Sequence, residues 1–150
     1  MTKNIYIYLL LGFLYTSDFI PDNNSTLNYT QVFFKWPQIE NAEYYLVNIY
    51  DNIGENIQFD SPYNSILIED LFDWNNEYIW TVCGIDNSEN PIFCHDSKTI
   101  NINPLPSNYP NNVFILNHND LEALQGITIL DYESLNFSVG LNMNGLPIWY

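Results

Sequence analysis

Apolar and polar residues alternate along much of this chain, and the alternation is typical of β-strands. Between residues 71 and 102, Tyr78, Trp80 and Val82 recur with a period of two, and the residues between them fall on the opposite face. A period of two places successive side chains on opposite sides of a strand, so both faces can pack. The pattern predicts a strand with two usable faces.

The strand is followed by a turn and a second apolar run, which together predict a β-hairpin. Residues 86–91 are Asp, Asn, Ser, Glu, Asn and Pro, a typical turn composition, and Ile92, Phe93 and Cys94 follow. A turn centred on residues 88 and 89 predicts three cross-strand pairs: Ile85 with Ile92, Cys83 with Cys94, and Tyr78 with Thr99. The two cysteines of the chain are therefore expected to be neighbours.

Further short strands are predicted at 31–36, 43–51, 56–59 and 65–69, separated by Gly, Pro, Asn and Asp. No stretch shows a helical period, so we expect an all-β, antiparallel sandwich. The predicted core residues are large and apolar and lie on one face of each strand: Trp36, Tyr45, Val47, Ile49, Ile66, Ile68, Leu71, Tyr78, Trp80 and Val82.

A proline-rich linker is predicted at 104–112, and a second β segment follows it at 113–150. Its strands are expected at 113–116, 126–131, 136–143 and 147–150, with a hairpin turn at Asn144-Gly145. A single small sheet exposes one apolar face, so we expect side chains of this segment to lie open to water. They are Ile127, Ile129, Phe137, Val139 and Trp149.

Lys3 near the start is followed by an apolar run of eleven residues and then by small residues, which is the pattern of a signal peptide at 1–17. A buried first strand is the alternative. The run is too short to cross a bilayer as a helix. Residues 18–28 are polar and are predicted to be a linker to a sandwich at 29–103. We expect a secreted, periplasmic or cell-surface protein, with no membrane contact beyond the export signal.

The chain is strongly acidic, with 18 acidic residues, three lysines and a net charge of −15. Nucleic acid and anionic membranes are excluded as partners, because binding phosphates requires clusters of Lys and Arg. Solubility accounts for the acidity. The partner expected from the sequence is a protein or a glycan of unknown identity.

The residues that could carry chemistry are few. Cys83 and Cys94 could form a disulfide, remain as buried thiols or contribute to a metal site; a zinc site needs four ligands, and His95 is predicted to point away from Cys94. His95 and His118 are the only histidines, and each is interpreted as a surface residue. Carboxylates in the predicted turns could bind calcium, but turn chemistry accounts for them. We expect no catalytic, cofactor-binding or metal-binding residue.

Residues 29–103 resemble the fibronectin type III domain. In that family a Leu precedes a Tyr on the penultimate strand, the tyrosine corner, as Leu71 precedes Tyr78, with a spacing one residue longer than the commonest. Trp36 ends a predicted strand before a proline, as in the family, and residues 42–47 are similar to its third strand. The resemblance implies an immunoglobulin-like sandwich in which Trp36, Leu71, Tyr78 and Trp80 have structural roles.

Residues 113–150 contain a further resemblance, carried by Gly126–Leu130 and Asn142–Trp149. These stretches are similar to the opening blade of secreted arylsulfotransferase-like β-propellers, with Asn142 where Asp is usual. In that family a nucleophilic His of later blades carries the sulfuryl group, and a propeller needs at least four blades. We therefore expect an incomplete blade.

Two functions follow as expectations. The first is the N-terminal, non-catalytic part of an exported arylsulfotransferase-like protein, in which sulfuryl transfer between phenolic compounds belongs to the rest of the propeller. The alternative is a fibronectin type III-like surface module that binds a protein or a glycan without catalysis. Fold alone does not decide between them.

Overall fold

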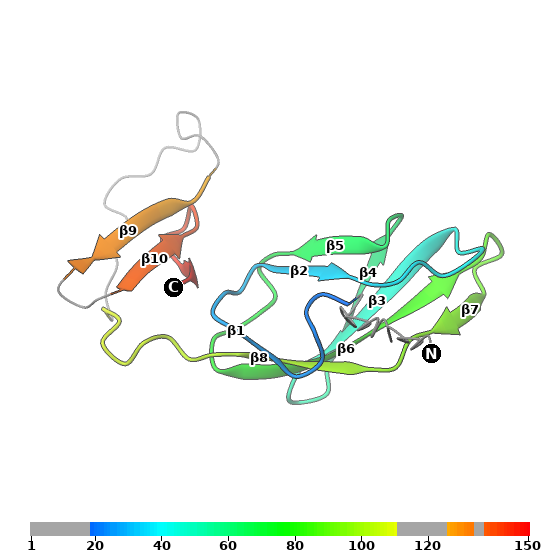
Figure 1. The fold of residues 1–150 in the computed structure, drawn as a ribbon, viewed down its shortest axis with the longest axis horizontal. Coiled ribbons are helices and arrows are strands. Elements are labelled where there is room, and N and C mark those ends of the chain that lie inside the picture. Colours follow the sequence, from blue (N-terminus) through cyan, green and yellow to red (C-terminus); the bar gives the residue numbers. More distant parts are fainter. Residues whose placement is uncertain (1–18, 111–125, 134–136) are drawn as a thin grey trace, which may run out of the picture.

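The structure is a computed structural model, which describes residues 19–110, 126–133 and 137–150. The described residues form an all-β protein without an α-helix. Figure 1 shows two groups of strands, a larger one formed by β1 to β8 and a smaller one formed by β9 to β11. The predicted signal peptide at 1–17, the predicted strand at 113–116 and His118 lie outside the described residues.

The larger group is built around β6, the longest strand. One sheet has the order β1-β8-β6-β3-β4, and β7 pairs with the C-terminal half of β6 on the same side as β8. The strands of this sheet are β1 (Ser25–Leu27), β3 (Tyr44–Tyr50), β4 (Asn56–Ser61), β6 (Asn76–Ile85), β7 (Pro91–Cys94) and β8 (Lys98–Ile102). All neighbouring pairs are antiparallel except β1 with β8.

A two-stranded sheet covers the inner face of the larger one. It consists of β2 (Val32–Lys35) and β5 (Ser65–Ile68), which pair antiparallel. β2 alternates buried and exposed residues, as expected for a strand with one face toward a core. Its Phe34 is fully buried and lies edge-on to Trp80 of β6, with 4.9 Å between ring centroids. The two sheets therefore enclose one core, in agreement with the predicted sandwich.

Most of the predicted core is confirmed. Every predicted core residue is buried except Ile66 and Leu71, which are partly buried and pack against the core. Phe72 is buried next to Leu71 and lies edge-on to Tyr78 at 4.9 Å. A connection without a regular period does not reveal which of two adjacent apolar residues turns inward, and here the larger one does.

The predicted hairpin register is right for one pair and wrong for two. Cys83 pairs with Cys94, as predicted. Ile85 pairs with Pro91 instead of Ile92, because a bulge follows Gly84. Tyr78 pairs with Ile100 instead of Thr99, since the chain leaves the ladder between β7 and β8 and rejoins it one residue later.

The stretch 18–28, expected to be a linker, contributes to both sheets. The backbones of Ile20 and Lys35 exchange hydrogen bonds of 2.9 and 2.8 Å, and β1 then pairs with β8 in the other sheet. The ring of Phe19 packs edge-on against the indole of Trp80, with 6.1 Å between ring centroids, and Leu27 is buried. Two apolar side chains thus suffice to anchor a mostly polar stretch.

The C-terminal sheet has the order β11-β10-β9. Its antiparallel strands are β9 (Thr128–Tyr132), β10 (Phe137–Leu141) and β11 (Pro147–Trp149). The predicted turn at Asn144-Gly145 is confirmed. Gly145 has a φ of 73°, and the side-chain oxygen of Asn142 accepts hydrogen bonds from the backbone N–H groups of Asn144 and Leu146.

This sheet packs against one end of the sandwich. The N–H of Thr30 donates to the carbonyl of Ile148 at 2.8 Å, and the N–H of Tyr150 donates to the carbonyl of Asn28 at 3.1 Å. The indole Nε1 of Trp74 donates to the carbonyl of Pro147 at 3.1 Å, and its ring lies 5.4 Å from that of Tyr150. Backbone and side-chain contacts therefore both join the two parts.

Docking and packing within the sheet change the expected exposure of its apolar residues. Val139 was expected to lie open to water, but it is fully buried. Ile127 and Ile129 are exposed, at 51% and 67%, as expected. Trp149 is half-buried and lies against the backbone of Gly140.

The tyrosine and the tryptophan of β6 should differ in their contributions to stability. The hydroxyl of Tyr78 accepts a hydrogen bond from the N–H of Asp73 at 2.9 Å. Tyr78→Phe should lower the free energy of unfolding by about 1–2 kcal/mol, whereas Trp80→Ala should lower it by about 3–5 kcal/mol because it leaves a cavity. Urea unfolding measures both. Equal, small effects would contradict this assignment of the inward face.

The C-terminal sheet should not tolerate a side chain at Gly140. A Cβ there would overlap the Trp149 indole, whereas a Cβ at Gly126 meets no atom within 4 Å. Gly140→Ala should therefore destabilise the sheet by about 1–3 kcal/mol and speed amide hydrogen exchange in β10 and β11. Gly126→Ala is the matched control and should leave exchange unchanged. Unchanged exchange in the Gly140 variant would show that the indole does not occupy this position.

Candidate functional site

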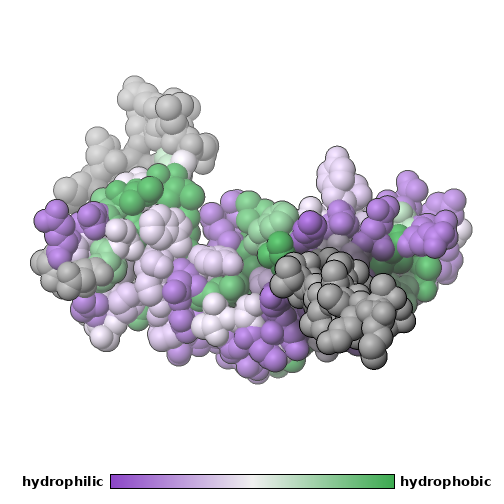
Figure 2. Space-filling model, in the orientation of Figure 1, coloured by the Kyte–Doolittle hydropathy of each residue, from purple (hydrophilic) through white to green (hydrophobic). Residues whose placement is uncertain are grey.

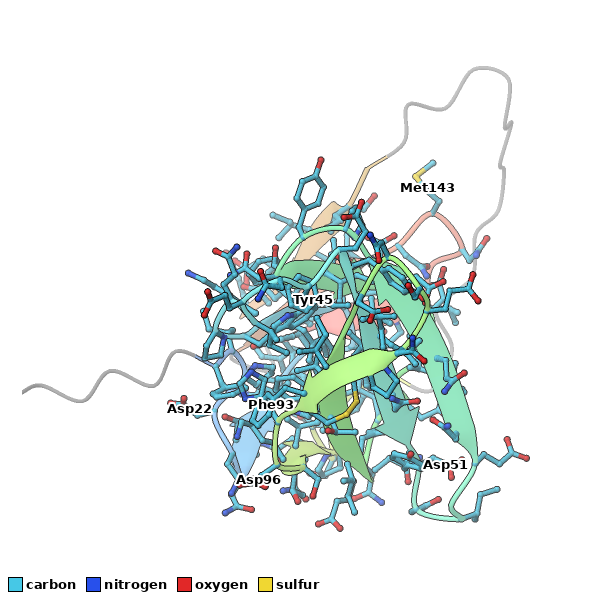
Figure 3. All side chains as sticks on the ribbon, turned by 90° about the vertical axis from the view of Figure 1, so that its right-hand side faces the viewer. Asp22, Tyr45, Asp51, Phe93, Asp96 and Met143 are labelled. Carbon is cyan, nitrogen blue, oxygen red and sulfur yellow. A yellow bond between two sulfur atoms is a disulfide. The ribbon has the colours of Figure 1, made fainter. Side chains whose placement is uncertain are left out.

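The two cysteines form a disulfide. Cys83 of β6 and Cys94 of β7 are joined with 4.0 Å between their Cα atoms, and Figure 3 shows the bond behind the β7 ribbon, near the labelled Phe93. The described residues contain no free cysteine. Of the three alternatives for the cysteines, a disulfide, buried thiols or a metal site, the structure contains the disulfide, which joins β6 to β7. Disulfides persist in oxidising compartments, so the bond is compatible with an extracellular protein.

His95 follows β7 and lies between two phenylalanine rings. Phe19 and Phe93 both contact the imidazole edge-on, with 5.0 Å between ring centroids. Burial lowers the pKa of His95, and the positive charge of Lys98 adds to this, whereas the Pro37 backbone and Asp96 oppose it. Its Nε2 is buried without a hydrogen-bond partner among the described residues. Folding therefore favours a neutral imidazole held by aromatic contacts.

Two aspartates of the hairpin turns, Asp51 and Asp86, accept hydrogen bonds from backbone N–H groups of their own turns. The Oδ1 of Asp51 accepts hydrogen bonds from the N–H groups of Ile53 and Glu55, at 3.0 and 2.9 Å. Asp86 does the same for Ser88 and Asn90, at 2.8 and 2.9 Å. These are Asx turns, which order a loop without a metal ion. Across the described ranges, no group of three or more His, Cys, Asp or Glu is arranged to hold a metal.

A concave site lies between the sandwich and the C-terminal sheet. It has two adjoining parts of about 440 and 320 Å³, which share Gln31, Asp70 and Asn142. Four segments line it: the residues just before β2, the connection from β5 to β6, the residues just before β9, and the hairpin from β10 to β11. We call this site the junction cleft.

The walls of the junction cleft are held in place by the contacts that join the two parts. The hydrogen bonds from Thr30 to Ile148 and from Trp74 to Pro147 join residues that line the cleft from its two sides. Asp70 has a φ of 57°, a left-handed conformation that Asp tolerates better than most residues. This bend lies where the chain leaves β5 and passes along the cleft.

The junction cleft is polar and acidic with an aromatic side. Its carboxylates are Glu69, Asp70 and Asp73, its amides are Gln31, Asn142 and Asn144, and its aromatic residues are Phe72 and Trp74. Among the described residues, its lining contains no Lys, Arg or His. The cleft can therefore accept and donate hydrogen bonds to a ligand, but it has no positive charge to offer an anion.

The predicted structural residues lie in or beside the core, whereas no sequence pattern predicts the junction cleft. Trp36, Tyr78 and Trp80 are buried in the core, and Leu71 lines the cleft from a partly buried position. The cleft residues come from segments more than 100 positions apart, from Gln31 to Asn142, and no local pattern links them. Only the docking of the C-terminal sheet brings them together.

Comparison with known proteins adds no relative. No protein-family profile, no curated protein and no solved structure matches the chain.

The described residues include no helix that is long and apolar enough to cross a membrane.

Removing the disulfide should destabilise the sandwich without changing its fold. The bond spans 11 residues of sequence, and closing a loop of that size in the unfolded chain is worth about 2–3 kcal/mol in the chain-entropy treatment. Cys83→Ser combined with Cys94→Ser should lower the free energy of unfolding by this amount, measured in urea. The oxidised and reduced wild-type protein should differ similarly, and identical midpoints would show that the bond is absent in solution.

Proposed function

We propose that this chain is an exported, non-catalytic module in which a fibronectin type III-like sandwich carries a sheet resembling the opening blade of an arylsulfotransferase-like propeller. The observation that carries the proposal is the environment of Tyr78. Its hydroxyl binds the backbone five residues upstream, which is the interaction of a tyrosine corner. The buried Phe72 occupies the place in which the family has a Leu, at the spacing that Leu71 misses by one residue.

The order of the strands gives further support. A sheet built from β3, β4, β6 and β8 faces one built from β2 and β5, which corresponds to the two layers of such a sandwich. Backbone hydrogen bonds join β11 to the residues before β2. The second sheet is therefore packed directly against the sandwich. In this proposal, sulfuryl transfer belongs to propeller blades that carry a nucleophilic His.

A second function is favoured by the junction cleft. An all-β module with an ordered polar cleft at the junction of two sheets has the geometry of a binding site. A surface module that binds a protein or a glycan is therefore the alternative, and it needs no catalytic residue.

Export and catalysis can be tested on the same chain. When it is expressed with residues 1–17 in a bacterial host, the protein should be recovered outside the cytoplasm with its N-terminus near Asp18 and its cysteines unreactive to thiol labels. The control is the chain without residues 1–17, which should stay in the cytoplasm.

The purified protein should release no nitrophenol from 4-nitrophenyl sulfate in the presence of a phenol acceptor. Cytoplasmic recovery of the full chain with an intact N-terminus would refute export. Turnover of the aryl sulfate would refute a non-catalytic role.

A further inference from the structure

The polar side chains of the junction cleft have unused hydrogen-bonding groups. The side chains of Gln31, Glu69, Asp70 and Asn144 make no hydrogen bond to another described residue. Asn142 uses its oxygen for the hairpin turn, which leaves its Nδ2 group free among the described residues. Carboxylates and amide oxygens accept, and amide NH₂ groups donate, so the cleft presents both kinds of group. A ligand rich in hydroxyl groups matches such a mixture, because each hydroxyl donates and accepts.

The negative charge of the cleft disfavours anionic ligands. Its lining holds the carboxylates of Glu69, Asp70 and Asp73 and no basic residue, and the whole chain has a net charge of −15. Sulfated, phosphorylated or uronic acid-containing ligands would meet repulsion at close range. Neutral hydroxyl-rich ligands and those that carry an ammonium group meet none.

The aromatic side of the cleft adds an apolar surface. Trp74 is half-buried, and its position is set by the hydrogen bond to Pro147 and by the contact with Tyr150. The C–H groups of a sugar ring, like an ammonium group, are attracted to an aromatic surface. The volume, about 440 and 320 Å³ for the two parts, lies within the range of small-ligand sites.

We infer that the junction cleft binds one end of a neutral or amino-sugar oligosaccharide. Amides and carboxylates of Gln31, Asp70 and Asn142 hydrogen-bond the sugar hydroxyls, and Trp74 provides the apolar wall. Because residues of both sheets are needed, the site exists only when the C-terminal sheet is docked. This inference rests on the binding function given above as the alternative, and it depends neither on export nor on the resemblance to sulfotransferases.

The test uses the full chain and three trisaccharide-sized probes of similar size: cellotriose (neutral), a glucosamine trisaccharide (cationic) and a heparin-derived fragment (sulfated). Calorimetry and amide NMR should show saturable binding of the first or second probe. The shifts should concentrate at the Trp74 indole N–H and the Asn142 side-chain amide. The sulfated fragment should not bind.

Substitutions inside and outside the cleft test whether the sugar binds there or elsewhere on the surface. Asp70→Asn keeps a residue that tolerates the left-handed conformation, and Gln31→Ala removes one amide; each should weaken binding by about tenfold. The control is Asp60→Asn, which removes an exposed carboxylate of β4 outside the cleft and should leave the affinity unchanged. Unfolding midpoints show whether each variant keeps its fold.

Three outcomes would overturn the inference. They are no saturable binding of either sugar up to about 10 mM, tighter binding of the sulfated fragment, and binding that neither cleft substitution weakens. None of these bears on export or on the absence of sulfotransferase activity, so the two sets of results can be told apart.

Discussion

The inward face of β6 carries Tyr78, Trp80 and Val82, and these side chains must be covered before the sheet is stable in water. β2 and β5 supply that cover, with Phe34 packed edge-on against Trp80. β6 also pairs with β3 on one side and with β7 and β8 on the other, so the larger sheet is built around the strand that makes this contact. The hydroxyl at the end of the tyrosine side chain fixes the path of the connection that enters β6, and the disulfide joins its far end to β7.

The C-terminal sheet is held against the sandwich by a small set of contacts. Backbone hydrogen bonds between residues 28–30 and residues 148–150, and the bond from the indole of Trp74 to Pro147, hold it against the sandwich. This arrangement creates the junction cleft, since each wall comes from a different part of the chain. Figure 2 shows that apolar surface also remains on this part of the molecule, where Ile127, Ile129 and Leu146 are exposed. The same sheet thus contributes to a core, a polar cleft and an exposed apolar face.

The side chains that could carry chemistry in the described residues are engaged in structural contacts. His95 packs between two phenylalanine rings, and burial lowers its pKa. Asp51 and Asp86 accept hydrogen bonds from backbone N–H groups of their own turns, and both cysteines are in a disulfide. What remains is an acidic cleft whose side chains have unused hydrogen-bonding capacity.

The sequence by itself determined the all-β class, most of the core and the pairing of Cys83 with Cys94. Each of these follows from local information: a period of two, turn residues and the spacing across a hairpin. The tertiary structure decided what depends on contacts between distant segments. Phe72 rather than Leu71 is buried, and Tyr78 pairs with Ile100. Residues between 19 and 28 pair with strands of both sheets, and Val139 is buried. The junction cleft belongs to this second group, because its walls meet only when two sheets dock, and no local pattern encodes that contact.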